Sequence, residues 1–103
     1  MNAQIFKEIQ DLKRQILPNE KVILFGSQAR GDARKDSDWD LLVLLNKDKI
    51  NFNEDYDKYA NPFYHISLKH GTHISIIFDT KRDWDTNPSL LRYNVEQEGI
   101  EVI

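Results

Sequence analysis

The sequence predicts a small α/β domain of the α+β type, in which helices pack against a mixed β-sheet. Two short apolar runs, at residues 22–25 and 41–45, have the length and composition of buried strands. Segments with helical spacing of apolar residues lie before and after these runs, an alternation typical of a sheet with helices packed on it. Because 103 residues suit one domain, we expect a single domain over residues 1–103.

The first sixteen residues have the pattern of an amphipathic helix. Its apolar residues recur at spacings of three or four: Ile5, Ile9, Leu12 and Ile16. Pro18 and Asn19 are expected to end this helix, because proline cannot continue it. The first strand, residues 22–25, then leads directly into Gly26 and Ser27.

The segment between the two apolar runs is short. Residues 28–31 are expected to form one or two helical turns, followed by a polar stretch at 32–36. A parallel crossover needs about a dozen residues or more, so the two strands are expected to pair antiparallel, as in a hairpin. Asp38 and Asp40 stand at the entry of the second strand, and Trp39 between them is expected to pack in the core.

The second half of the chain continues the alternation. We expect a helix from about Phe52 to Lys69, ended by Gly71. Pro62 either kinks this helix or occupies the first turn of a second one. Residues 74–78 are expected to form the third strand, and residues 81–85 a short helical turn.

The last expected helix begins at a recognisable start signal. Asn87 and Pro88 have the order of an N-cap residue followed by proline at the first helical position. This helix is expected to reach Glu98 and to end at Gly99. Residues 100–103 are expected to add a short edge strand.

Gly26 and Ser27 have the features of a phosphate-binding turn. Glycine between a strand and a helix lets the backbone approach a ligand closely, and the first amides of a helix point outward without partners. The Ser27 hydroxyl adds a donor. By itself, a Gly-Ser pair after a strand is more often only a turn.

Asp38 and Asp40 form a second candidate element. Residues two apart on a strand point to the same face, so the two carboxylates are expected side by side. Such a pair repels unless a cation neutralises it, and Mg²⁺ takes carboxylate and phosphate oxygens as ligands. An isolated Asp-x-Asp is usually a solvated or capping pair, and Arg30 and Ser37 alone suit a surface arginine and a turn residue. The combination in this order is much more specific than its parts.

The segment from Phe25 to Gly31, followed by Ser37 to Val43, resembles the Gly-Ser…Asp-x-Asp signature of the DNA polymerase β-like nucleotidyltransferases. It is most similar to the short stand-alone type, the minimal nucleotidyltransferases. The resemblance implies the polymerase β-like fold and transfer of AMP from ATP to an acceptor hydroxyl. It implies Asp38 and Asp40 as catalytic Mg²⁺ ligands and Gly26 and Ser27 as nucleotide-binding residues.

Two further residues of the segment, Arg30 and Ser37, join the expected nucleotide-binding set. Arg30 either lies near the phosphates or braces the loop that carries Gly26 and Ser27. Ser37 directly precedes the first aspartate. The expected cofactor is Mg²⁺, with ATP as substrate.

One expected carboxylate of this family is missing. Active members carry a third acidic residue on the next strand, where this chain has Ser75, with His73 two residues earlier on the same face. Serine is a poor ligand for Mg²⁺, and a neutral histidine suits softer metals. His73 is expected at the loop edge or, because histidine serves in acid–base chemistry, in the site. Asp79 has the same parity but is expected to end the strand.

Two functions therefore compete. The first is a Mg²⁺-dependent nucleotidyltransferase, and the family habit of pairing with helical HEPN-domain proteins makes a HEPN-type partner the leading acceptor in an antitoxin-like role. The second is a catalytically weak or inactive module that acts by contact with its partner. Polymerisation on nucleic acid is disfavoured by the net charge of −3.

Composition limits the remaining classes. The chain contains no cysteine, which excludes disulfide scaffolds and thiolate metal sites. No stretch of about 18 apolar residues predicts a membrane helix, and no leader-like segment begins the sequence, so a cytoplasmic protein is expected. A domain of this size has a modest core, so docking to a partner or homo-oligomerisation is expected as well.

Overall fold

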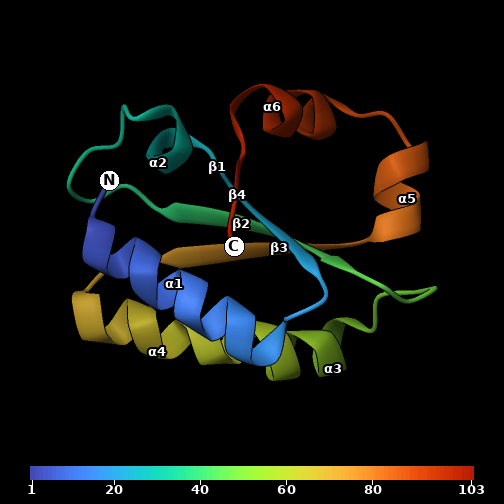
Figure 1. Ribbon diagram of the computed structural model, residues 1–103, viewed down its shortest axis with the longest axis horizontal. Coiled ribbons are helices and arrows are strands. Elements are labelled where there is room, and N and C mark those ends of the chain that lie inside the picture. The colour runs from blue at the N-terminus through green and yellow to red at the C-terminus, as the bar shows by residue number, and fades with distance from the viewer.

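Four strands form one sheet with the order β3-β2-β1-β4 in the computed structural model, which describes residues 1–103 (Figure 1). The strands are β1 (Lys21–Phe25), β2 (Trp39–Leu45), β3 (Ile74–Thr80) and β4 (Ile100–Glu101). β1 runs antiparallel to β2 and to β4, whereas β2 and β3 run parallel. The mixed sheet and the antiparallel pairing of the first two strands are therefore confirmed.

Helices cover both faces of this sheet. They are α1 (Ala3–Ile16), α2 (Ser27–Arg30), α3 (Phe52–Asp55), the π-helical turn η1 (Tyr56–Ala60), α4 (Asn61–His70), α5 (Lys81–Thr86) and α6 (Leu90–Glu98). In Figure 1, α1 and α4 lie side by side against one face, whereas α5 and α6 lie on the other side. The small sheet thus forms the middle layer of three.

The larger core lies between the sheet and the α1/α4 pair. Its buried members come from α1, the strands, α4 and the C-terminus: Ile5, Ile9, Leu17, Val22, Leu24, Trp39, Leu41, Val43, Leu45, Phe63, Ile66 and Val102. Because successive strand residues point to opposite faces, the odd-numbered residues of β2 belong to this core. The expectation that Trp39 packs in the core is confirmed, since only 2% of its surface is exposed.

A smaller core lies on the opposite face. It contains Ile23, Leu42, Leu44, Trp84 and Val95, which join β1 and β2 to α5 and α6. Asp40 shares the parity of Leu42 and Leu44, so its side chain leaves the sheet on this face.

The long helix expected from Phe52 to Lys69 is interrupted by a π turn. In η1 the amide of Asn61 donates to the carbonyl of Tyr56, five residues earlier, and Pro62 then lies in the first turn of α4. A wider turn next to a proline accommodates the missing amide of its ring. Of the two alternatives expected for Pro62, the structure shows the second, in which Pro62 lies in the first turn of a second helix. Gly71 ends α4 in the left-handed conformation, as expected, with φ of 62°.

The expected start of the last helix was wrong. Asn87 is the C-cap of α5, and α6 begins after Ser89, whose hydroxyl accepts a hydrogen bond of 3.0 Å from the Arg92 amide. A serine hydroxyl at the N-cap satisfies an amide that helix geometry leaves unpaired. The sequence contains both signals, and the later one is used. β3 also extends to Thr80, so Asp79 lies within the strand instead of ending it.

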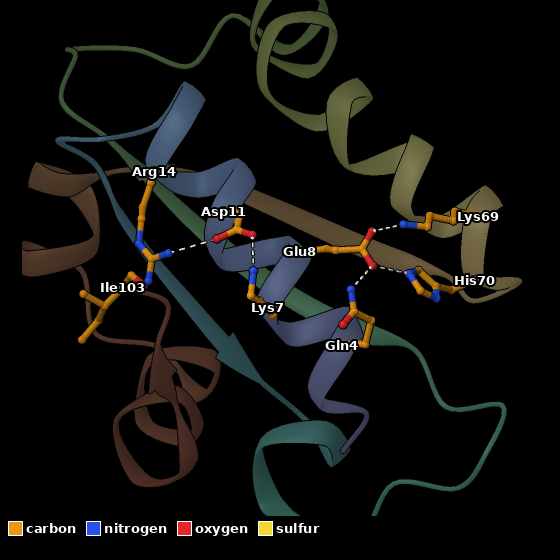
Figure 2. A network of polar contacts seen from close by, with 8 residues as sticks. All are labelled: Gln4, Lys7, Glu8, Asp11, Arg14, Lys69, His70 and Ile103. Carbon is orange, nitrogen blue, oxygen red and sulfur yellow. Dashed lines mark hydrogen bonds and ion pairs between the residues drawn. The ribbon is translucent and has the colours of Figure 1, made fainter.

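A polar network joins α1 to α4 at the edge of the larger core (Figure 2). The Glu8 carboxylate accepts hydrogen bonds from Gln4 on its own helix and from Lys69 on α4, and pairs with His70 at 2.7 Å. These contacts lower the pKa of Glu8 to about 2, with Gln4 contributing most, then His70 and Lys69. The charged form of Glu8 therefore ties the two helices together.

No helix in the structure has the length and apolar character needed to cross a membrane.

Candidate functional site

Gly26 and Asp40 lie side by side where β1 ends and β2 begins. The antiparallel register pairs Phe25 with Asp40, which brings the residue after β1 to the start of β2. Gly26 has φ of 77°, a conformation that side chains rarely adopt. A Cβ atom at this position would overlap Oδ2 of Asp40. The turn and the carboxylate can therefore approach this closely only because residue 26 is glycine.

The parallel register of β2 and β3 places the two candidates for the third position beside the aspartates. Asp40 pairs with Ser75, and Asp38 and His73 each lie two residues earlier, just before the paired strands. Nδ1 of His73 is 3.4 Å from Oδ2 of Asp38. Both side chains are more than half exposed, so the pair is open to solvent. The side chains of this row point to the face that carries the smaller core.

Two negative charges meet at the start of β2. Burial raises the pKa of the Asp40 carboxyl above its ordinary value, and the charge of Asp38 raises it further. The charge of Arg30, and that of His73 when it is protonated, act in the opposite direction without cancelling the shift, and the charge of Glu98 adds to it. Asp40 therefore lies where a cation would be favourable.

No group of three or more histidine, cysteine, aspartate or glutamate residues is arranged to hold a metal ion. The donors at this place are two carboxylates with open surroundings. Mg²⁺ commonly binds through one or two carboxylates and takes its other ligands from water and phosphate. The residues present therefore fit a metal carried in part by a nucleotide, and they do not form a closed protein cage.

The side chain of Arg30 contacts carboxylates other than those of Asp38 and Asp40. Its guanidinium contacts Glu98 of α6 at 3.2 and 3.3 Å and Asp32 at 3.2 Å. These carboxylates raise the pKa of Arg30, with Glu98 contributing most. Of the two roles expected for Arg30, these contacts favour bracing of the loop over contact with phosphates.

Ser37 is part of the loop that leads to Asp38. Its hydroxyl accepts a hydrogen bond of 2.7 Å from the Arg34 amide, and its carbonyl accepts one of 3.2 Å from the side chain of Gln28. Gln28 lies on α2 and is buried, with 6% of its surface exposed. A buried amide with this partner joins the turn after β1 to the segment before β2.

Glu98 also contacts the candidate site, although no sequence pattern predicted it. Its carboxylate accepts a hydrogen bond of 3.1 Å from the Gly26 amide in addition to those from Arg30. The only signal in the sequence was its place before Gly99 at the end of the last helix. A separation of 72 residues from Gly26 gives no local pattern to detect.

A family model described as a nucleotidyltransferase domain matches residues 3–101, nearly the whole chain. The protein belongs to the nucleotidyltransferase domain family. The resemblance of the Gly-Ser…Asp-x-Asp segment is thereby confirmed at the level of the family. No curated protein matches the chain.

Solved structures share the nucleotidyltransferase fold. A protein described as a minimal nucleotidyltransferase is 24% identical, with a TM-score of 0.62 over 97% of this chain and 95% of its own. A chain of a toxin–antitoxin complex with AMP-PNP is 18% identical, with a TM-score of 0.66 over 95% of this chain and 72% of its own. A chain of a variant of the toxin–antitoxin pair MntA-HpeT is also 18% identical, with a TM-score of 0.63 over 100% and 72%. At these identities the likeness shows the fold.

Proposed function

We propose that this nucleotidyltransferase binds ATP with Mg²⁺ and transfers AMP to an acceptor hydroxyl. The observation that carries the proposal is the contact between Gly26 and the Asp40 carboxylate, with Asp38 on the same face of the sheet. This contact puts a turn suited to phosphate next to carboxylates suited to a metal. In the reaction, the acceptor oxygen forms a bond to the α-phosphorus, the bond from that phosphorus to the bridging oxygen breaks, and pyrophosphate leaves.

Each residue has a distinct part in this proposal. Asp38 and Asp40 hold Mg²⁺, which supplies charge neutralisation for the triphosphate. Ser27 offers its hydroxyl to the terminal phosphates, and Gly26 provides the space for their approach. The Gly26 amide is already bonded to Glu98, so we assign it no phosphate contact. Ser37 acts through the loop that carries Asp38, by the hydrogen bonds it makes with Arg34 and Gln28.

The position of the missing third carboxylate, occupied by Ser75, determines how fast AMP is transferred in this proposal. Ser75 pairs with Asp40 in the sheet and brings no charge to the metal, which supports slow transfer. His73, 3.4 Å from Asp38, is the nearby group that can accept the proton of the acceptor hydroxyl. We therefore propose that nucleotide binding is retained and that transfer is slow or depends on a partner.

A protein acceptor is the proposed substrate. Two of the structural neighbours described above come from toxin–antitoxin complexes, one of them with AMP-PNP. These neighbours support a partner protein as acceptor, with an antitoxin-like role for this chain, and the family resemblance of the Gly-Ser…Asp-x-Asp segment is the reason to propose a partner of the HEPN type. The second candidate function is a binding module that acts by contact alone, and the uncharged Ser75 is the observation that favours it.

Calorimetry of ATP binding with and without Mg²⁺ tests the binding part of the proposal. Asp38→Asn and Asp40→Asn should each weaken ATP binding by at least about tenfold. Each variant removes a charged ligand of Mg²⁺, and a charged contact of this kind contributes more than about 1.4 kcal/mol. Asp36→Asn is the matched control, because it removes an exposed carboxylate from the same loop. A wild-type protein that binds no ATP would refute the proposal.

Transfer is tested separately with ATP labelled at the α-phosphate and a co-expressed neighbouring protein. A label that appears on the neighbour, and disappears in Asp38→Asn, supports the enzyme. ATP binding without any labelled product favours the binding module.

A further inference from the structure

We infer that Glu98 is a positioning residue of the nucleotide site, and that it holds the Gly26 turn and Arg30 in place from the end of the last helix. This inference rests on the proposed function, because it concerns the same turn. One carboxylate accepts three hydrogen bonds: 3.1 Å from the Gly26 amide and 3.2 and 3.3 Å from the Arg30 guanidinium. Gly26 is the N-cap of α2 and Arg30 is its last residue, so Glu98 contacts both ends of this single turn.

The turn needs such support. Gly26 has φ of 77° and no side chain that could cap α2, and α2 is only four residues long. A helix of one turn has little stability of its own, since its nucleation costs more than its few hydrogen bonds return. Contacts from outside therefore determine its conformation. Glu98 supplies a charged acceptor at one end and an ion pair at the other.

The position of Glu98 is itself well defined. The next residue, Gly99, lies so close to β1 that a Cβ would be 2.7 Å from Cγ2 of Ile23, and it would also be 2.5 Å from the carbonyl oxygen of Val95 in α6. Val95 belongs to the smaller core and is 3% exposed. The end of α6 is therefore pressed onto the strand that leads into Gly26. The Glu98 side chain is 19% exposed, which limits the directions that its carboxylate can take.

A competing role would make Glu98 an internal substitute for phosphate, which ATP must displace. The two roles predict opposite effects of removing the carboxylate. A positioning residue improves ATP binding, so its loss weakens binding. A competitor hinders ATP binding, so its loss strengthens it. The contact with Arg30 favours positioning, because Arg30 is also held by Asp32 and stays turned to the loop.

The test compares Glu98→Ala, Glu98→Gln and the control Glu96→Ala by two measurements. Glu96 lies on the same helix and pairs with Arg92, away from the turn. The first measurement is the Gly26 amide signal in ¹H–¹⁵N NMR spectra without nucleotide, a readout that a merely stabilising residue elsewhere would not move. The second is the Kd for ATP with Mg²⁺ by calorimetry, supported by thermal unfolding to verify that each variant is folded.

We expect Glu98→Ala to shift the Gly26 amide upfield and to raise the Kd about tenfold, the usual size for loss of a charged hydrogen bond. Glu98→Gln can still accept from the Gly26 amide, so its Kd should rise by about threefold, with a smaller shift. Glu96→Ala should match the wild type in both. An unchanged or lower Kd in a folded Glu98→Ala protein would overturn the inference. If the wild type binds no ATP, the proposed function fails, and an unmoved Gly26 amide in Glu98→Ala would then reject the positioning role independently.

Discussion

The Cα of Gly26 faces Oδ2 of Asp40 so closely that no side chain fits between them. This contact brings the turn after β1 against the first residues of β2, and it joins the two halves of the Gly-Ser…Asp-x-Asp segment in space. Gly26 and Asp40 are 14 positions apart along the chain, and the antiparallel register of β1 and β2 brings them together in space.

Gly26→Ala should destabilise the protein and abolish ATP binding. The variant combines a backbone conformation, φ of 77° with ψ of −160°, that is essentially restricted to glycine and costs other residues about 1–3 kcal/mol, with overlap onto the Asp40 carboxylate. Gly31→Ala is the matched control, because Gly31 has φ of 84° and a Cβ there meets no atom within 4 Å. Urea unfolding and calorimetry should show a moderate loss of stability for Gly31→Ala with ATP binding retained. Equal effects of both variants on stability and on ATP binding would mean that the overlap with Asp40 contributes nothing.

Asp40→Asn should stabilise the fold at pH 7 while it weakens Mg²⁺-dependent ATP binding. The folded protein raises the pKa of Asp40, so it disfavours the charged form, and this group costs stability once the pH rises above its unfolded pKa. The amide carries no charge at any pH. The melting temperature of Asp40→Asn should therefore exceed that of the wild type at pH 7. The difference should shrink as the pH falls through the raised pKa of Asp40 toward the ordinary Asp pKa of 3.8, and disappear below it.

A lower melting temperature for Asp40→Asn at pH 7 would contradict this account. It would mean that the carboxylate makes a favourable contact in the folded protein that outweighs burial and the charge of Asp38. Addition of Mg²⁺ provides a second observation, since it should raise the melting temperature of the wild type more than that of the variant.

Ser75→Asp should raise the rate of AMP transfer. The new carboxylate would stand beside Asp40 in the parallel register of β2 and β3, where it can complete the metal site. The expected gain is at least about tenfold in the transfer rate, or about 1.4 kcal/mol in the barrier. The third negative charge should also lower stability without Mg²⁺. Ser75→Asn, similar in size but uncharged, serves as the control, and equal rates for the two variants would place the missing carboxylate elsewhere.

Glu8 should make the stability of the folded protein depend on pH in the acidic range. Its pKa is lowered to about 2 in the folded protein, so the charged form contributes stability above its ordinary pKa of 4.5. That contribution should disappear as the pH falls from 4.5 to about 2. Glu8→Gln should therefore melt at a lower temperature than the wild type at pH 6 and approach it near pH 2. Asp11→Asn is the control, because Asp11 forms exposed contacts with Lys7 and Arg14 on the same helix (Figure 2). A constant difference between Glu8→Gln and the wild type across this range would exclude the ionic contribution.

The sequence by itself determined the elements that local patterns encode. Apolar runs mark β1 and β2 because buried strands of this type are apolar along their length, and Ile5 and Ile9 mark the buried face of α1 because a helix repeats every 3.6 residues. The short connection between the strands predicted their antiparallel pairing. Gly26, Ser27, Asp38 and Asp40 were found because they lie close together along the chain in a specific order.

The tertiary structure alone decided what depends on distant parts of the chain. Local signals would allow α6 to start at Asn87 or at Ser89. In the structure Asn87 caps the end of α5, which contacts β2 and β3, and α6 starts after Ser89. The register of β2 and β3 determines that Ser75, and no neighbouring residue, pairs with Asp40. The role of Glu98 depends on a hydrogen bond across 72 residues, and no periodicity or spacing can encode such a contact. Packing of α6 onto β1 brings these groups together, because the free energy of burying Val95 and Ile23 is gained only when helix and strand are in contact.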